Sequence, residues 1–202
     1  MSDEILRETA RHLLLVGVSV GVAALAGVPG GIVLARRPRA ERLVLGATSI
    51  VQTIPSLALF GFLIPLRWVG GIGLRTALVA LTLYALLPIL RNTVTGLRGV
   101  DPAVRDAGVG LGMTARQLLF QVELPLAAPV IVAGLRTAVV TAVGTATIAA
   151  AIGAGGLGVF IFRGVAMLDT ATILRGAVPA AAMAVAADLL LALLEHRVGP
   201  PR

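Results

Sequence analysis

Few residues of this sequence have the chemistry for catalysis or metal binding. The 202 residues include no cysteine and two histidines, which excludes a thiolate metal site and leaves little for a histidine-based one. Arg136 and Asp188 are the ionisable residues deepest within apolar segments, and such residues are functional candidates by default. We predict no metal site and no catalytic residue, so two opposite charges among apolar neighbours remain to be explained.

The run Gly153-Ala154-Gly155-Gly156-Leu157-Gly158 matches the dinucleotide-binding pattern G-x-G-x-x-G. That pattern has meaning only after a strand and before a helix, with an acidic residue about 20 positions further on. Here an apolar segment precedes the run and the next acid is Asp169. We interpret the run as an outer bend where backbones pack closely.

ATP hydrolysis by this chain is also excluded at the level of motifs. The sequence contains no lysine, and the Walker A pattern G-x-x-x-x-G-K-[ST] requires one. The chain is therefore expected to bind no cofactor, and any ATP must be used by another polypeptide.

The composition assigns the chain to a membrane. Hydrophobic residues make up 57% and charged residues 13%, whereas soluble domains average about 45–50% apolar and about 25% charged residues. Membrane-spanning helices need about 20 apolar residues each. We predict an all-α integral membrane protein in which residues 1–202 form one transmembrane domain.

Five uncharged or weakly charged segments are long enough to cross a bilayer. Span two contains Gln52, Pro55 and Pro65 and is expected to be kinked. The apolar stretch 157–168 is too short and is expected to be re-entrant or interfacial, so residues 151–170 contain no span. The predicted spans are residues 13–35, 43–66, 72–90, 124–151 and 171–194.

Small residues at helical spacing predict close helix packing. Gly17 and Gly21, and likewise Gly27 and Gly31, are four residues apart on the first span. This spacing lets two helices approach closely. Packing within the chain is favoured over packing between chains.

The arginines indicate the orientation of the spans. The net charge is +7, and in a membrane protein the position of that charge reports orientation rather than nucleic-acid binding. With the N-terminus outside, the inner segments hold ten arginines and the outer segments six. The positive-inside rule therefore predicts an outer N-terminus, a cytoplasmic C-terminus and a cytoplasmic segment 91–123.

Segment 91–123 is polar and has helix signals of its own. Asp101 and Pro102 are typical of a helix start, and the helix is expected to end at Ala107 before Gly108, Gly110 and Gly112. Thr114 to Val122 can form a second short helix. A solvated connector would need only about 4–6 residues, so the length favours a binding surface.

This segment resembles a known loop. Its spacing is similar to that of the EAA loop of ABC importer permeases, with Asp in place of Glu and Gly in place of the second Ala. The matching residues are Asp106, Ala107, Gly108, Gly112, Val122, Leu124 and Pro125. Further segments resemble the osmoprotectant branch of that family, which carries glycine betaine, carnitine or choline: 52–59, 110–114, 122–126, 134–138, 144–147 and 152–158.

The resemblance implies a type I ABC importer permease fold and a translocation subunit in a bacterial or archaeal cytoplasmic membrane. Its implied partners are cytoplasmic ABC ATPase subunits, which would hold the loop, a second permease copy or related subunit, an extracytoplasmic solute-binding protein and the lipid bilayer. Methionine-type importers share parts of these motifs, so an amino acid is the alternative solute. No substrate-binding residue is identified.

Two other classes of protein remain as alternatives. A self-sufficient channel would not need the long polar segment. An intramembrane enzyme would need a nucleophile with a base, or paired acids, and the spans contain one acid and no histidine or cysteine. Neither alternative accounts for the sequence as well as a permease does.

Arg136 and Asp188 have two readings. Arg136 is eleven residues past Pro125 and Asp188 is seven before Glu195, which are about 16 Å and about 10 Å along a helix. Both side chains would then lie near the cytoplasmic ends of their spans and reach interfacial water, which we favour. The alternative is a direct ion pair between neighbouring antiparallel helices.

Overall fold

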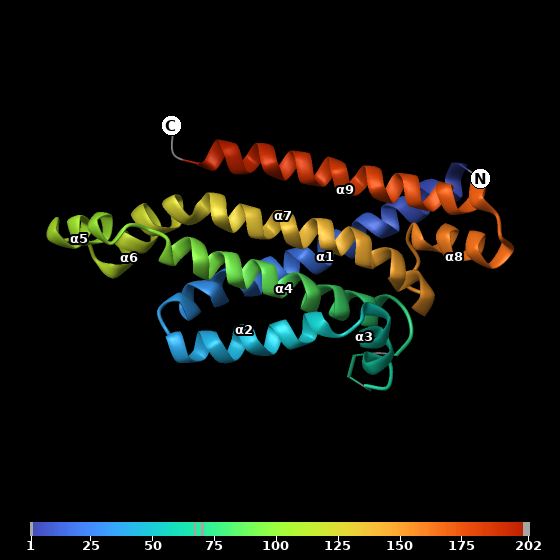
Figure 1. Ribbon diagram of the computed structural model, residues 1–202, viewed down its shortest axis with the longest axis horizontal. Helices are drawn as coiled ribbons and strands as arrows, with labels where there is room; N and C mark the ends of the chain where they lie inside the picture. The colour runs from blue at the N-terminus through green and yellow to red at the C-terminus, as the bar shows by residue number, and fades with distance from the viewer. Residues whose placement is uncertain (1, 67, 70, 200–202) are drawn as a thin grey trace.

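The computed structural model describes residues 2–66, 68–69 and 71–199, and these residues form helices without a strand (Figure 1). The helices are α1 (Ser2–Ala35), α2 (Pro38–Thr53), α3 (Ser56–Leu63), α4 (Leu74–Arg98), α5 (Pro102–Gly110), α6 (Ala115–Leu118), the π-helical turn η1 (Leu119–Glu123), α7 (Leu124–Ile148), the 3₁₀ turn η2 (Ala149–Ile152), α8 (Gly158–Met167) and α9 (Thr170–Val198).

The long helices are the candidate membrane spans. Within the described residues, four helical runs are long and apolar enough to cross a bilayer, and the bent pair of α2 and α3 gives a fifth. Helix α1 begins well before residue 13, and α4 continues past residue 90 to Arg98. The first residues of segment 91–123, up to Arg98, therefore belong to α4. Polar residues end the hydrophobic part of a helix but need not end the helix itself.

The predicted kink in span two is a break. Helices α2 and α3 meet at an angle of 103°, with Ile54 extended at φ −71° and ψ 126°. Pro55 disfavours the helical conformation at the preceding residue and has no N–H of its own. The chain therefore leaves the helix at Ile54 and starts another at Ser56.

The predicted second short helix is continuous with the fourth span. Helix α6 continues through η1 into α7 without a break, and the Leu124 N–H donates to the carbonyl of Leu119, five residues earlier. This wider turn lies directly before Pro125, which has no N–H to donate. The expected boundary at Pro125 is therefore a π-helical turn inside one long helix.

Glycines set the closest helix contacts. A Cβ on Gly27 would lie 2.8 Å from Ile89 Cγ2, and one on Gly31 would lie 2.5 Å from Thr93 Cβ, so the backbone of α1 lies directly against side chains of α4 there. This confirms packing within the chain for that glycine pair. Among the described residues, nothing lies within 4 Å of a Cβ added to Gly17 or Gly21, so packing within the described part of the chain does not use their spacing.

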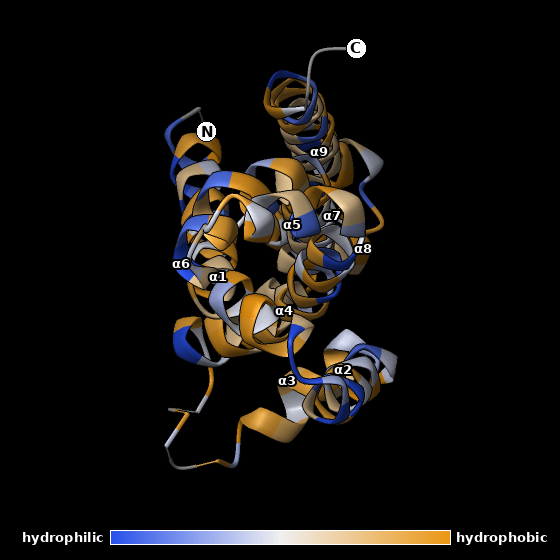
Figure 2. Cartoon of the chain, turned by 90° about the vertical axis from the view of Figure 1, so that its left-hand side faces the viewer, coloured by the Kyte–Doolittle hydropathy of each residue, from blue (hydrophilic) through white to orange (hydrophobic). Residues whose placement is uncertain are grey.

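The bundle has two different ends. Helices α5 and α6 project from one end, while α8 and the N-terminus lie at the other, and α9 runs along α7 (Figure 1). Viewed from the α5–α6 end, hydrophobic residues make up much of the long helices (Figure 2). Helix α8 has ten residues, about 15 Å, against about 30 Å for the hydrocarbon core.

Candidate functional site

Residues 101–123, called the projection below, are built around a capped helix. The Asp101 carboxylate accepts a hydrogen bond of 2.8 Å from the Ala103 N–H, and Pro102 follows it at the first helical position. Helix α5 continues past Ala107 to Gly110, which corrects the expected end. Glycine within a helix costs about 1 kcal/mol relative to alanine, which weakens a helix without ending it.

Gly112 ends α5. Its φ is +81°, its N–H donates to the Val109 carbonyl at 2.9 Å, and the Met113 N–H donates to the Gly108 carbonyl at 3.1 Å. This pair of bonds is a Schellman motif, whose turning residue needs the left-handed conformation. No described residue lies within 4 Å of a Cβ added to Gly112, so glycine is required there by its φ and not by lack of space.

Gly108 is required for lack of space and not for its backbone conformation. It is buried, and a Cβ there would lie 2.8 Å from Leu118 Cδ1 and 3.2 Å from Met113 Sδ. Helix α6 begins with a capping box, in which Thr114 and Gln117 bond each other's backbone N–H groups. Glycine in place of the family's alanine therefore lets α5 lie close to α6.

The other residues of the spaced pattern divide between surface and interior. Asp106, Ala107 and Pro125 are exposed, and Val122 and Leu124 are half-buried. The projection also exposes four large apolar side chains that the sequence pattern did not single out: Val104 (40% exposed), Val109 (61%), Leu111 (84%) and Phe120 (58%). Exposed apolar side chains on a segment that is otherwise polar are typical of a contact surface.

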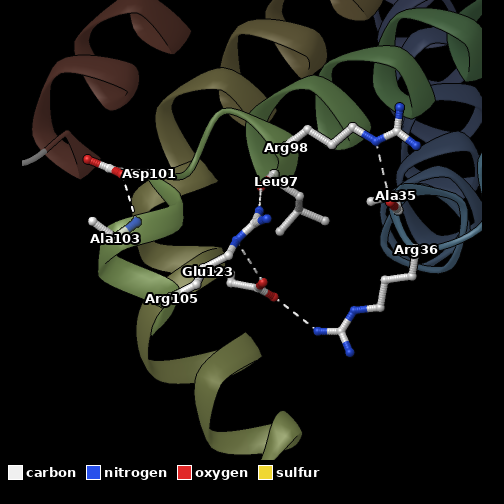
Figure 3. A network of polar contacts seen from close by, with 8 residues as sticks. All are labelled: Ala35, Arg36, Leu97, Arg98, Asp101, Ala103, Arg105 and Glu123. Carbon is white, nitrogen blue, oxygen red and sulfur yellow. Dashed lines mark hydrogen bonds and ion pairs between the residues drawn. The ribbon is translucent and has the colours of Figure 1, made fainter. Parts of the chain in front are cut away.

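Glu123 anchors the projection to the bundle. Its carboxylate is 3.0 Å from Arg36 Nη2 and 3.2 Å from Arg105 Nε, and Arg105 also donates to the Leu97 carbonyl (Figure 3). Nearby, Arg98 donates to the Ala35 carbonyl. Sequence reasoning did not identify Glu123, because its partners are 18 and 87 residues away.

Arg136 on α7 and Asp188 on α9 lie together. Arg136 Nε is 2.5 Å from Asp188 Oδ1 and Nη2 is 2.8 Å from Oδ2, which is a two-bond guanidinium–carboxylate pair. Arg136 Nη1 is also 3.5 Å from Glu195 Oε2. The structure thus has the direct pair, and the reading in which each side chain reaches interfacial water alone does not describe this arrangement.

A pocket of about 530 Å³ opens beside the break between α2 and α3. It is lined by α2, α3, α4 and α7, and most of its side chains are polar or small. The lining residues are Gln52, Thr53, Ile54, Pro55, Ser56, Tyr84, Leu87, Pro88, Arg91, Asn92, Thr137, Thr141 and Thr145. A periodic signal was present in the sequence, since Thr137, Thr141 and Thr145 are spaced four apart and lie on one face of α7.

Polar side chains at this pocket satisfy backbone groups freed by prolines. The Tyr84 hydroxyl donates to the Ile54 carbonyl at the break. Pro88 has no N–H to give to the Tyr84 carbonyl four residues earlier, and the Gln52 amide donates to that carbonyl at 2.8 Å instead. Irregular backbone at membrane depth is tolerated where it lines a cavity or is satisfied in this way.

The glycine run 153–158 forms a turn between η2 and α8. Gly153, Gly155 and Gly156 have φ between +73° and +85°, and the Gly156 N–H donates to the buried Glu8 carboxylate at 2.7 Å. Arg11 packs against Gly155. The interpretation of the run as a bend with closely packed backbone is confirmed.

A family model agrees with this architecture. Residues 27–200 match the family described as binding-protein-dependent transport system inner membrane component. The chain belongs to this family. The match includes the projection, the Arg136–Asp188 pair and the pocket, and it begins inside α1.

Individual permeases are similar over nearly the whole chain. The glycine betaine/carnitine/choline transport system permease protein OpuCB of Bacillus subtilis is 43% identical over 98% of this chain and 89% of its own. The osmoprotectant import permease protein OsmW of Salmonella typhimurium is 47% identical over 95% of this chain and 90% of its own.

Among solved structures, one of the MetNI methionine ABC transporter in inward-facing conformations has a TM-score of 0.89 at 26% identity, covering 99% of this chain and 98% of that one. The chain is thus a membrane permease with the ABC importer fold, as the EAA-like spacing predicted.

Proposed function

We propose that this chain is the translocation subunit of an ATP-driven importer for a quaternary-ammonium osmoprotectant such as glycine betaine, carnitine or choline. The observation that carries the proposal is the similarity to OpuCB and OsmW, permeases for such solutes, over nearly the whole length of all three chains. Methionine is the alternative solute, since the structural neighbour is a methionine transporter.

The ATPase is a separate subunit that docks on the projection. The chain has no lysine for a Walker A motif, while Val109, Leu111 and Phe120 offer an exposed apolar surface at the bundle end. Asp106 and Ala107 lie exposed on α5, the helix that carries Val109. The arginine distribution supports a cytoplasmic position for this end and an outer position for α8 and the N-terminus.

The solute passes along the pocket at the break between α2 and α3. Its hydroxyl and amide groups can replace water around a small polar solute without holding it tightly, and transport requires such weak binding. Five spans are few to enclose a pathway. A second copy, or a related permease, completes the pathway across a two-fold axis, and an extracytoplasmic binding protein delivers the solute.

The proposal is tested by reconstituting the chain with its ATPase and binding protein in proteoliposomes. We expect glycine betaine to stimulate ATP hydrolysis and to accumulate inside, whereas methionine does neither. Stimulation by methionine alone would favour the amino-acid alternative. Uptake without ATP would indicate a channel.

Docking and pathway are tested by separate variants. Leu111→Asp is expected to abolish co-purification of the ATPase, and Met167→Asp, an exposed position at the opposite end, should leave it intact. Thr141→Leu is expected to lower uptake with the ATPase still bound. Thr48→Leu is the matched control, because Thr48 lies outside the pocket lining.

A further inference from the structure

Glu123 is a buried acid at a structural junction. The residue is 8% exposed and ends the π-helical turn through which the projection becomes α7. A buried carboxylate is costly unless it is paired and hydrogen-bonded. Short π-helical segments inside α-helices occur frequently at functional sites. The position therefore requires partners, and its location suggests more than a packing role.

The two arginines that pair with Glu123 come from different parts of the bundle. Arg36 follows the end of α1, and its Nη2 is 3.0 Å from Oε2. Arg105 lies on α5, and its Nε is 3.2 Å from Oε1 of Glu123. The two groups form an ion pair without an aligned hydrogen bond. One carboxylate thus connects α5 to the end of α1 and to the start of α7 (Figure 3).

Two further contacts extend the connection to α4 and α2. Arg105 donates through Nη2 to the Leu97 carbonyl near the end of α4. Arg98, the last residue of α4, donates to the Ala35 carbonyl and forms an ion pair with Glu41 on α2. Helix α2 ends at the pocket. Arg105, which Glu123 holds, therefore joins α5 to α4, and Arg98, the next residue after Leu97, joins α4 to α2, the helix that borders the pocket.

We propose that Glu123 is the positioning residue through which movement of α5 reaches the ends of α1 and α4 and, by way of α2, the pocket. The proposal rests on the proposed function, because it takes the ATPase as the source of that movement. Charged groups paired in a partly buried site hold their geometry more firmly than exposed pairs do. When α5 is displaced, the Glu123 carboxylate moves Arg36, and the first and second spans follow.

The test compares uptake per ATP hydrolysed in the reconstituted complex. Glu123→Gln keeps the shape of the side chain and removes its charge. We expect the ATPase to remain bound and to hydrolyse ATP while uptake per ATP falls about fivefold or more, the lower end of typical coupling between sites. Glu123→Asp should retain part of the coupling, because the carboxylate remains. Glu195→Gln, another arginine-paired acid, is the matched control and should leave uptake per ATP unchanged.

A distance measurement separates transmission from mere structural support. Spin labels on Ala103→Cys and Arg39→Cys, both exposed, report on α5 and α2. In the otherwise unaltered chain these two elements should move together, so their distance stays constant when ATP is added. With Glu123→Gln the distance should change with ATP. If Glu123→Gln prevents assembly, Arg36→Gln removes one partner, leaves the Arg105 pair and is expected to lower uptake per ATP in the same direction.

The outcomes distinguish this inference from the proposed function. If glycine betaine and methionine both fail to stimulate hydrolysis by the unaltered complex, the proposed function fails. If the unaltered complex is stimulated and the assembled Glu123→Gln complex has the same uptake per ATP, only the role of Glu123 is overturned. An unchanged label distance in Glu123→Gln would overturn it as well.

Discussion

Gly108 and Gly112 belong to one spaced pattern and are required for different physical reasons. At Gly108 there is no space for a larger side chain, since an added Cβ would meet Leu118 and Met113. At Gly112 the limit is the backbone, with φ of +81° and open space around Cα. The two positions should therefore differ in which side chains they tolerate.

Gly112→Val is expected to reduce uptake while ATP hydrolysis continues. The left-handed conformation costs a non-glycine residue about 1–2 kcal/mol, so the end of α5 should shift and its contact with the ATPase should loosen. Asparagine tolerates this conformation better, and Gly112→Asn should keep more of the uptake. The measurement is uptake and hydrolysis in proteoliposomes at equal amounts of inserted chain. Equal uptake by the valine variant and the parent would contradict the assignment of this turn.

The Arg136–Asp188 pair should behave as a unit. Arg136→Asp alone places acids at positions 136, 188 and 195 near one another, and we expect a lower melting temperature and less monodisperse protein in detergent. Arg136→Asp combined with Asp188→Arg should recover most of the loss, because opposite charges again face each other. Arg197→Asp, on the exposed end of α9, is the control for a change of net charge. A double variant as unstable as the sum of its single variants would show that the pair contributes nothing by itself.

At the scale of elements, α2, α3 and α4 form one unit around two prolines. Pro55 breaks the second span, and Pro88 frees the Tyr84 carbonyl inside α4. The Tyr84 hydroxyl and the Gln52 amide then join the two helices across the break. The pocket is the space beside this junction, so its shape depends on the contacts that hold the broken span against α4.

Gln52→Leu should destabilise this unit by about 1–3 kcal/mol, the usual cost of leaving a buried carbonyl without a partner. Pro88→Ala supplies a backbone N–H that can donate to the Tyr84 carbonyl within the helix. We therefore expect Pro88→Ala to suppress part of the Gln52→Leu defect in thermal unfolding in detergent. If adding Pro88→Ala lowers stability further, Gln52 acts through another contact.

At the scale of the whole molecule, the two ends of the bundle should face different compartments. The arginine tally that predicts this includes Arg67 and Arg202, which lie outside the described residues. The structure separates α5 and α6 from α8 along the long axis of the bundle (Figure 1). Orientation is therefore a property that one labelling experiment can measure at two distant points.

Single cysteines report this orientation without background, because the chain has no cysteine. Met167→Cys on α8 should react with a membrane-impermeant maleimide in intact cells, and Ala103→Cys on α5 only after the membrane is opened. Both positions are exposed, so lack of reaction does not reflect burial in the chain. The reverse pattern of labelling would contradict an outer N-terminus and a cytoplasmic projection.

The sequence by itself determined the class of protein. Composition and span length depend on local hydropathy, and they predict an all-α membrane chain with five candidate spans, one of them broken in the structure. The EAA-like spacing around Asp106, Gly112 and Pro125 predicted the family. Asp101 as a helix start was also predictable, because a cap depends on neighbouring residues.

The tertiary structure decided which distant residues meet. Gly31 packs against Thr93, and Arg136 pairs with Asp188. Gly17 and Gly21 have the same spacing as Gly27 and Gly31, but a Cβ added to either would meet no described residue within 4 Å. Hydropathy along a chain gives neither the rotation of a helix about its axis nor its neighbours. Both are set by packing summed over the bundle, and for that reason the partners of Glu123 and the pocket at the broken span emerge only in three dimensions.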